Sequence, residues 1–385
     1  MLGCPSEYRA VIHWRGGARP YPAAMDDLTG VSWSRTINDI ADAQVTVPKG
    51  GREPECCQAL GRVEPWVHEL GIYRDADLVW QGPIVRVTER RSEFVIDAQD
   101  VFAWLDKLVN TFRVTYTSQD EDSRGRRRGR VTYIAWNHLR LNLEESALSD
   151  PPDYPGIMPY VVRRDGDLPT IKFEKDGSDN TTVWTEFVGN IWRELTKRGL
   201  TWTTVGRALL LRGRPTSKTQ AIARLDIEDF TGEVELIKDG TTAATYAFAT
   251  SQQTTDINDG RTVGTGRVGT PYGRLDTLVR LQEEDASNAD LREAARGALG
   301  GRNPVPAAIS VPQGSQLSPE APVNIRWLVP GERIDVTTEA YCTAISNAFM
   351  VSDVDVTWES GGEKVAVTLI PLGDVDEDLE SGVGP

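Results

Sequence analysis

Leu78–Val109 reads LVWQGPIVRVTERRSEFVIDAQDVFAWLDKLV and contains the clearest structural pattern in the sequence. In Ile84–Glu89, Val85 and Val87 alternate with Arg86 and Thr88, and the polar turn before the return strand Phe94–Ala98 predicts a β-hairpin. Asp100 comes next, where its carboxylate can accept a hydrogen bond from a free amide of a helix's first turn. Apolar residues then recur at helical spacing, at Phe102, Leu105, Leu108 and Val109. The stretch therefore predicts a hairpin, an Asp cap and a short amphipathic helix. It contains no catalytic motif, so we expect it to have a structural role.

The length, net charge and cysteine content of the chain limit the kinds of protein that it can be. At roughly 100–200 residues per domain, 385 residues predict two or three domains. A formal net charge of -15 argues against non-specific binding to nucleic acid or to an anionic membrane. No apolar run approaches the roughly 20 residues that span a bilayer, and the first residues lack the pattern of a signal peptide. The four cysteines show no metal-ligand spacing, so we expect free thiols and synthesis in a reducing cytoplasm.

Short strand patterns follow one another through the first 100 residues. With the hairpin they amount to about six strands separated by turn signals, which is typical of a barrel or a sandwich. Gly16–Pro22 is expected to break the chain, and Cys56–Leu60 to form one helical turn. The strand patterns outside the hairpin are Tyr8–Trp14, Ala43–Val47, Trp66–Tyr73 and Asp77–Trp80.

The character of the sequence changes after Asn110. Ser118–Arg130 is a run of charges with no apolar residue, which indicates a solvated loop, with phosphate contact by Arg124–Arg130 as the alternative. Asp150–Pro159 is rich in proline and is expected to be irregular. We therefore interpret residues 111–180 as an elaborated insertion on the first barrel.

Two helices and a final hairpin are predicted beyond the insertion. The helices are Thr182–Leu200, which Gly199 would cap, and Ser287–Leu299. Gly260–Gly273 contains five glycines and is expected to be a flexible loop, because no strand or Lys-Ser/Thr pair supports a phosphate-binding loop. Strand expectations cover Leu200–Val205, Ala208–Leu211, Arg224–Ile237, Thr241–Ala249, Ile334–Thr338 and a hairpin from Val354 to Leu369 with its turn at Glu359–Gly362.

The search for a site yields no catalytic, cofactor-binding or metal-binding residue. His13, His68 and His138 form no metal-binding pattern, so structural or surface roles are expected. Asp97 and Asp100 are the carboxylate pair that a glycoside hydrolase would need, but a capping role for Asp100 and a solvent-facing Asp97 explain both more simply. The sequence therefore predicts a protein that is not an enzyme and has no cofactor.

Several segments in order resemble bacteriophage tail hub proteins, in particular the minor tail proteins of siphophages that infect actinobacteria. Each segment is short, and the resemblance lies in their order and spacing over most of the chain. None carries a catalytic signature, so no active-site residue is transferred, and residues 111–180 match nothing in the family pattern. The segments are Trp33–Pro48, Trp80–Ile84, Ala98–Leu105, Leu195–Trp202, Leu291–Leu299 and Leu328–Ile334.

The resemblance implies a mainly β fold with α+β insertions, made of two β-barrel domains of tail-hub type, an inserted domain and short helices. The expected divisions are 1–110 for the first barrel, 111–200 for the inserted α+β region, 201–372 for strands completing the core and the second barrel, and 373–385 for an acidic disordered tail. It also implies a homotrimeric virion protein of the tail tip, synthesised in the host cytoplasm. This hub would join the sixfold tail tube to threefold tip components and line the DNA exit channel.

The same resemblance implies the partners. They are two further copies of the chain, the distal tail or tail tube protein, the tape-measure protein, and downstream tip or fibre proteins. No specific binding to nucleic acid and no membrane span are expected. Two other functions stay open at this point: a baseplate module that binds host-surface glycans through exposed Trp and Tyr, and a cell-wall hydrolase.

Overall fold

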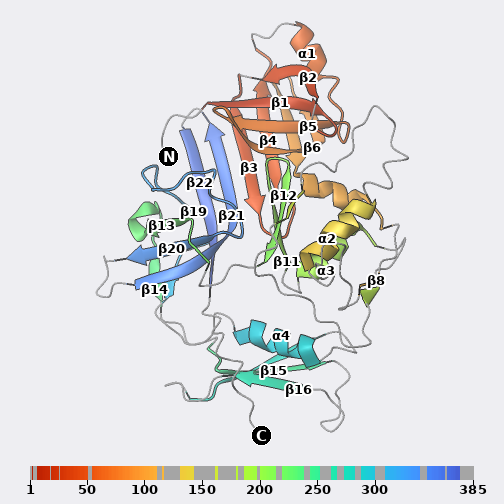
Figure 1. Ribbon diagram of the computed structural model, residues 1–385. Coiled ribbons are helices and arrows are strands. Elements are labelled where there is room, and N and C mark those ends of the chain that lie inside the picture. The colour runs from red at the N-terminus through yellow and green to blue at the C-terminus, as the bar shows by residue number, and fades with distance from the viewer. Residues whose placement is uncertain are drawn as a thin grey trace.

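A computed structural model describes residues 2, 7–17, 19–25, 27–50, 54–110, 115–116, 131–142, 161–163, 179–180, 186–196, 200–213, 219–237, 243–251, 262–266, 273–281, 288–299, 308–338, 345–359 and 362–372. Within these residues the chain is mainly β, with one large mixed sheet, four smaller sheets and short helices beside them (Figure 1).

Seven antiparallel strands from the first 100 residues form most of the large sheet. Their order is β3-β4-β7-β6-β5-β1-β2, and helix α1 (Pro54–Leu60) packs near β2. In β4 the residues Ala43, Val45 and Val47 are buried while their neighbours are not, as a strand with one buried face requires. The strands are β1 (Tyr8–Trp14), β2 (Pro20–Met25), β3 (Gly30–Thr36), β4 (Asp42–Pro48), β5 (His68–Arg74), β6 (Asp77–Glu89) and β7 (Glu93–Gln99).

Strands from the end of the chain continue this sheet. β21 (Ile345–Glu359) pairs antiparallel with β3, and it also pairs with β20 (Arg333–Thr338) and β22 (Gly362–Pro371). The short strands β13 (Ala223–Asp226) and β19 (Ser315–Gln316) complete it. Buried side chains from both ends of the chain therefore belong to one hydrophobic core.

The large sheet curls back on itself. Six strands separate β1 from β22 in the sheet order, yet the Tyr8 hydroxyl donates to Glu363 Oε1 at 2.5 Å. Arg74 Nε of β5 also donates to Glu363 Oε1, at 2.8 Å, and the rings of Tyr8 and Trp358 are 5.7 Å apart. The barrel-like architecture predicted from the sequence is thus confirmed, and such closure shields edge strands from other chains.

An inserted unit with an aromatic core packs beside the sheet. Phe102 and Trp202 stack with their ring centroids 3.6 Å apart, and Trp192 packs against both rings. The unit consists of η1 (Val101–Lys107), α2 (Val131–Arg140), α3 (Val188–Thr196), β11 (Leu200–Val205), β12 (Ala208–Gly213), β9 (Val161–Arg163), and the pair β8 (Thr115–Tyr116) and β10 (Asp179–Asn180).

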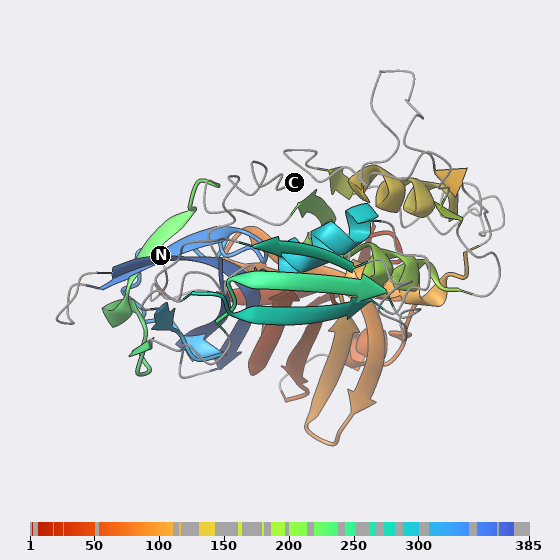
Figure 2. The ribbon, with the colours of Figure 1, turned by 90° about the horizontal axis from the view of Figure 1, so that it is seen from below.

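A third part, called here the α4 unit, is a three-stranded sheet with one helix. Its strand order is β16-β15-β17, and Figure 2 shows the three strands side by side with α4 against them. β14 (Glu235–Ile237) comes before the unit in the sequence and β18 (Ala308–Ser310) comes after it, and these two strands pair with each other. The short helix η4 (Ile227–Asp229) precedes β14. The unit contains β15 (Tyr246–Ser251), β16 (Thr262–Gly266), β17 (Asp276–Leu281) and α4 (Asn288–Leu299).

Many of the local predictions are confirmed. Tyr8–Trp14 is β1, and the Gly206-Arg207 turn joins β11 to β12 with Gly206 at φ 58°. The final hairpin turns between Glu359 and Gly362. Asp100 caps a helix as expected, although η1 is a 3-10 helix rather than an α-helix.

Other predictions are wrong in identifiable ways. Asp77–Trp80 and Ile84–Glu89 belong to one strand, β6, which bends at a register shift between Ile84 and Arg86 as it passes from one part of the sheet to the next. Gly16–Pro22 was expected only to break the chain, but β2 begins at Pro20. Proline is tolerated there because β2 is an edge strand.

Three further segments differ from expectation. Arg224–Ile237 is not one extended stretch, because Asp226 accepts from Glu228 N and starts η4 within it. The glycine-rich Gly260–Gly273 contains β16, which pairs with β15. The predicted helix Thr182–Leu200 is helical only over Val188–Thr196 in its described part, since Phe187 lies in a bridge to Val109.

Several predictions fall outside the described residues. They concern the charge run Ser118–Arg130, the proline-rich Asp150–Pro159, the caps Gly199 and Ser287, most of 111–180, and the tail 373–385. The proposed domain boundaries stay predictions.

Candidate functional site

The three histidines are buried and lie on two different units. His13 and His68 are on the neighbouring strands β1 and β5, whereas His138 is on α2. Burial lowers the pKa of His13 and His68, and it lowers the pKa of His138 to about 4, so all three are neutral at pH 7. Within the residues that the structure describes, no group of three or more His, Cys, Asp or Glu residues could hold a metal ion.

Asp97 and Asp100 do not form a catalytic pair, because their carboxylates have different partners. Asp97 Oδ2 pairs with Arg86 Nε at 2.6 Å and its Oδ1 accepts from Gln44 Nε2 at 2.7 Å. Neighbouring strands supply both of these partners on the partly exposed face of the sheet. Asp100 points instead into the junction between the sheet and the inserted unit.

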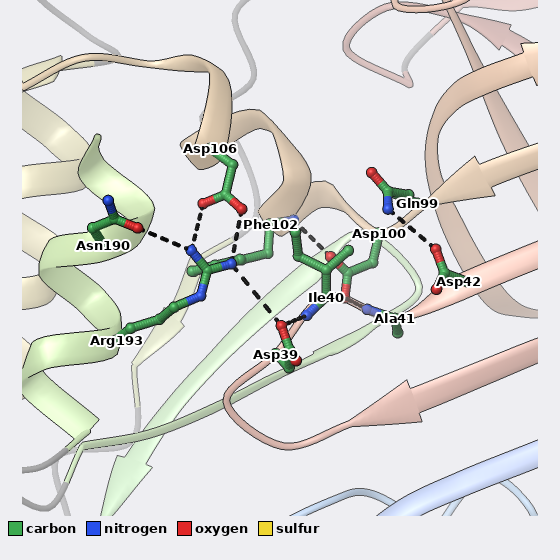
Figure 3. A network of polar contacts seen from close by, with 10 residues as sticks. All are labelled: Asp39, Ile40, Ala41, Asp42, Gln99, Asp100, Phe102, Asp106, Asn190 and Arg193. Atoms are coloured by element: carbon green, nitrogen blue, oxygen red, sulfur yellow. Dashed lines mark hydrogen bonds and ion pairs between the residues drawn. The ribbon is translucent and has the colours of Figure 1, made fainter. Parts of the chain in front are cut away.

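Asp100 connects three segments at this junction, as Figure 3 shows in part. Its carboxylate accepts from Ala41 N at 3.1 Å, from Phe102 N at 2.9 Å and from the Thr204 hydroxyl at 2.8 Å. These donors come from the β3–β4 turn, from η1 and from β11. Burial raises the pKa of Asp100 to about 7, although the three donors act in the opposite direction. The residue thus fixes the inserted unit to the sheet.

A second contact of the same junction is more exposed. Arg193 of α3 donates from Nη1 and Nη2 to the two carboxylate oxygens of Asp106, at 2.9 and 2.8 Å. Asp39 of the β3–β4 turn lies 4.0 Å from Arg193 Nη2 (Figure 3). A Cβ at Gly189 would lie 1.9 Å from Asp106 Oδ1, so only glycine allows this carboxylate so close to α3.

A buried ion pair attaches the β11–β12 hairpin to strand β5 of the sheet. Glu69 is fully buried, and Arg207 donates to it from Nε at 2.8 Å and from Nη2 at 3.1 Å. Gln81 Nε2 and Gly16 N donate to the same carboxylate at 3.0 and 2.9 Å. The Gly206-Arg207 turn was predicted from the sequence, but its partner Glu69 lies 138 residues away and no local signal indicates it.

An arginine is also buried inside the curled sheet. Arg35 donates to the carbonyls of Ile325, Leu328 and Val79 at 2.9–3.1 Å. Burial lowers its pKa to about 10, so the guanidinium stays charged at neutral pH. It therefore holds the 325–328 segment against β6 through backbone acceptors, which satisfy the charge by hydrogen bonding.

A few large apolar side chains of the described residues are exposed to solvent. Among the described residues, the large apolar side chains that are more than one third exposed are Phe187, Leu275, Leu278 and Trp327. Trp327 is 58% exposed and follows Arg326, which pairs with Asp77 at 3.1 Å. Leu275 and Leu278 lie together on the α4 unit.

None of the described helices is long and apolar enough to cross a membrane. Cys57 is a free thiol. The observed polar clusters connect structural units, and the Asp97 and Asp100 carboxylates have partners that explain both residues structurally.

No protein-family model and no curated protein matches the sequence. Solved structures do match the fold. A tail protein from Neisseria meningitidis MC58 superposes with a TM-score of 0.55 at 11% identity, covering 97% of both chains. The 43 kDa tail protein of prophage MuSo2 from Shewanella oneidensis gives 0.53 at 11% identity, covering 94% of this chain and 97% of the other.

A third structure, the prophage tail protein gp18 from Listeria monocytogenes EGD-e, gives a TM-score of 0.52 at 8% identity, with 93% and 94% of the two chains covered. At such identities the likeness concerns the fold, and it extends over nearly the whole length of each chain. The chain therefore has the fold of these phage and bacterial tail proteins.

Proposed function

We propose that this chain is a structural virion protein of a phage tail, and specifically a homotrimeric hub at the tail tip. The observation that carries the proposal is the near-complete coverage of both chains in the superposition on tail proteins. A shared fold alone is a weak argument for function. Here it agrees with the order of segments that resembles tail hubs in the sequence, including the short helix capped by Asp100 and the turn at Val329–Glu332.

The proposed hub joins the sixfold tail tube to threefold tip components and lines the DNA exit channel. With two barrel domains in each chain, three copies would supply six similar barrels, and a ring of heterologous contacts closes by symmetry. The net charge of -15 suits a channel that does not retain DNA. The proposed partners are the distal tail or tube protein, the tape-measure protein and the tip or fibre proteins. The hub is proposed to be made in the host cytoplasm and to become part of the virion. A siphophage of actinobacteria is the proposed source.

The proposal includes no enzymatic activity. His13 and His138, which could serve as bases, have pKa values lowered by burial, and Asp97 is occupied by Arg86 and Gln44. A purified chain is expected to release no soluble product from cell walls. Product release that is lost in Asp100→Asn would favour the hydrolase alternative.

Light scattering at several concentrations, followed by negative-stain imaging, tests the hub proposal. We expect a mass three times the 42.5 kDa of one chain and a ring with a central hole. A chain that stays monomeric alone and when mixed with its tail tube neighbour would contradict the proposal.

The glycan-binding alternative has one observation in its favour, the 58% exposed Trp327, because stacking on sugars requires an accessible aromatic face. It predicts that Trp327→Ala abolishes binding to host-wall glycans while leaving the oligomer unchanged.

A further inference from the structure

The three-stranded sheet of the α4 unit has one covered and one open face. Ala247 and Ala249 of β15 are buried against α4, together with Leu291. Because side chains alternate along a strand, Tyr246 and Phe248 point to the opposite face. Figure 1 and Figure 2 show the sheet on the far side of α4 from the large sheet. The open face is therefore directed away from the large sheet.

Strand β17 lies at one edge of this sheet and is exposed along its length. In the described strand order β16-β15-β17 it has a neighbour on one side only. Arg274, Asp276 and Arg280 are exposed, and Leu278 is 55% exposed. These side chains share the open face, whereas Val279 packs against the α4 core from the other face. β17 thus presents two arginines, an aspartate and a leucine in one row at the edge of the sheet.

The backbone of β17 directs alternate residues toward and away from β15. Tyr246 N donates to the Leu275 carbonyl at 3.0 Å, and the two strands pair in parallel from that point. In this ladder the odd-numbered residues of β17 direct their N–H and C=O groups toward β15. Asp276, Leu278 and Arg280 direct theirs to the opposite side. Such an outward row can hydrogen-bond to a further strand.

The charges along this edge are complementary to themselves. When two copies of β17 meet antiparallel with Leu278 opposite Leu278, Asp276 of each copy lies opposite Arg280 of the other. Outward backbone groups then face outward groups, so each opposed pair exchanges both of its hydrogen bonds. Side chains directly opposite in such a pair are close enough to form ion pairs. Arg274 Nε pairs with Asp276 Oδ1 at 2.8 Å within the chain, which leaves the second carboxylate oxygen for another cation.

Other arrangements of the same two strands lose this match. A shift of the antiparallel pair by two residues places Leu278 opposite Asp276 or Arg280 and breaks both ion pairs. A shift by one residue sets outward groups against groups that already bond to β15. A parallel pair in register brings like charges together, which is unfavourable. The sequence of β17 therefore favours one antiparallel register with twofold symmetry.

We propose that the β17 edges of two copies of this chain pair antiparallel about a twofold axis at Leu278. The two Leu278 side chains pack together beside Phe248, their neighbour on β15, and an Asp276–Arg280 ion pair lies on each side of them. An uncovered edge strand can recruit further chains. The twofold contact closes after two copies and covers both edges. It does not depend on the proposed hub, whose ring would form through the barrel domains.

Hydrogen exchange of the full chain, measured on the peptide that covers 273–281, tests the pairing. A contact as small as one strand edge is weak, so its occupancy depends on protein concentration. We expect the outward amides of β17 to exchange about fivefold more slowly at about 500 μM than at about 5 μM. Exchange in the parent at the higher concentration that is as fast as in an Arg280→Asp variant would overturn the proposal.

Two charge reversals test the register. In pairs of identical chains, Arg280→Asp sets carboxylates opposite each other and Asp276→Arg sets guanidinium groups opposite each other, so each variant alone is expected to lose the slow exchange. An equimolar mixture of the two variants forms both ion pairs again and is expected to recover it, less so at high salt. A mixture that exchanges as fast as the single variants would overturn the proposed register.

Arg292→Asp is the matched control for the change in net charge. Arg292 is exposed on α4, across the sheet from the open face, so this variant is expected to exchange like the parent. Loss of the slow exchange in the control as well would contradict pairing through Arg280. Because Arg280→Asp removes only the β17 contact, light scattering of this variant tests the trimeric hub independently of the pairing.

Discussion

The curled sheet and the α4 unit differ in what their cores contain. The sheet buries large side chains such as Trp33, Phe94 and Phe349, and its strands come from both ends of the chain. The α4 unit buries mainly alanines, with Leu291 and Leu299 as its largest fully described core residues. Because hydrophobic stabilisation scales with the apolar area removed from water, the sheet is the stable body and the α4 unit is held more weakly.

This difference suggests that the sheet with the inserted unit is rigid and that the α4 unit is less so. The sheet and the inserted unit are interlocked by buried polar contacts at Asp100 and Glu69, and Arg35 holds the 325–328 segment within the sheet body. In the described part of the α4 unit, the ion pair Arg274–Asp276 lies on the surface. A rigid body with a weaker peripheral unit suits a protein that keeps its shape while one surface changes partners.

The largest loss of stability is expected from Arg207→Met, which removes the buried ion pair with Glu69. It leaves the fully buried Glu69 without its cation, so the free energy of unfolding should fall by about 3–5 kcal/mol. Urea denaturation followed by tryptophan fluorescence measures this change. Arg86→Met is the matched control, because the side chain of Arg86 is 71% exposed and its pair with Asp97 should contribute less than about 1 kcal/mol. Equal losses in both variants would show that burial of the pair is unimportant.

A second substitution separates the two regions directly. Leu291→Ala removes the main apolar side chain of the α4 unit's core and should destabilise that unit by about 2–3 kcal/mol. Amides of β15 should then exchange faster, while amides of β4 should keep their rate. A uniform increase in both strands would mean that the α4 unit and the sheet unfold as one cooperative body.

The pH dependence of stability sharpens the description of the rigid body. The pKa of Asp100 is about 7 in the folded chain and about 3.9 when unfolded, so the folded chain retains a proton that the unfolded chain releases. The raised pKa of Asp100 adds to the free energy of unfolding. This stabilisation is fully present below about pH 4 and is lost as the pH rises through about 7.

Asp100→Asn removes this contribution. Relative to this variant, the parent should lose about 2 kcal/mol between pH 5 and pH 8, as measured by urea denaturation at both values. The buried histidines have lowered pKa values and give the opposite slope, but they are present in both chains and cancel in the comparison. A variant with the same slope as the parent would assign the pH dependence to other groups.

The smallest effect is expected at the exposed part of the junction. Arg193→Ala removes the bidentate contact with Asp106, but both side chains are about one third exposed and solvent screens the pair. We expect a loss below about 1 kcal/mol in the urea midpoint analysis. A loss as large as that of Arg207→Met would show that the junction depends on both ion pairs equally.

The sequence predicted elements wherever the decisive interactions are local. The strand at Phe94–Ala98, the capping by Asp100 and the tight turns at Gly206 and Glu359–Gly362 all depend on neighbouring residues, and they are confirmed. Proline at Pro20 and the glycines of β16 misled the prediction, because pairing with a neighbouring strand stabilised segments with weak strand propensity.

By itself the sequence determined the mainly β character, the positions of most strands and the absence of a local catalytic motif, since these follow from residue type and spacing. The tertiary structure decided which strands are neighbours, and so brought Glu363 to Tyr8 and Arg207 to Glu69. It also decided which face of β15 stays open, because the packing of α4 covers one side only. Contacts between distant residues depend on the closure of the sheet, which carries no signature in any single stretch of the chain.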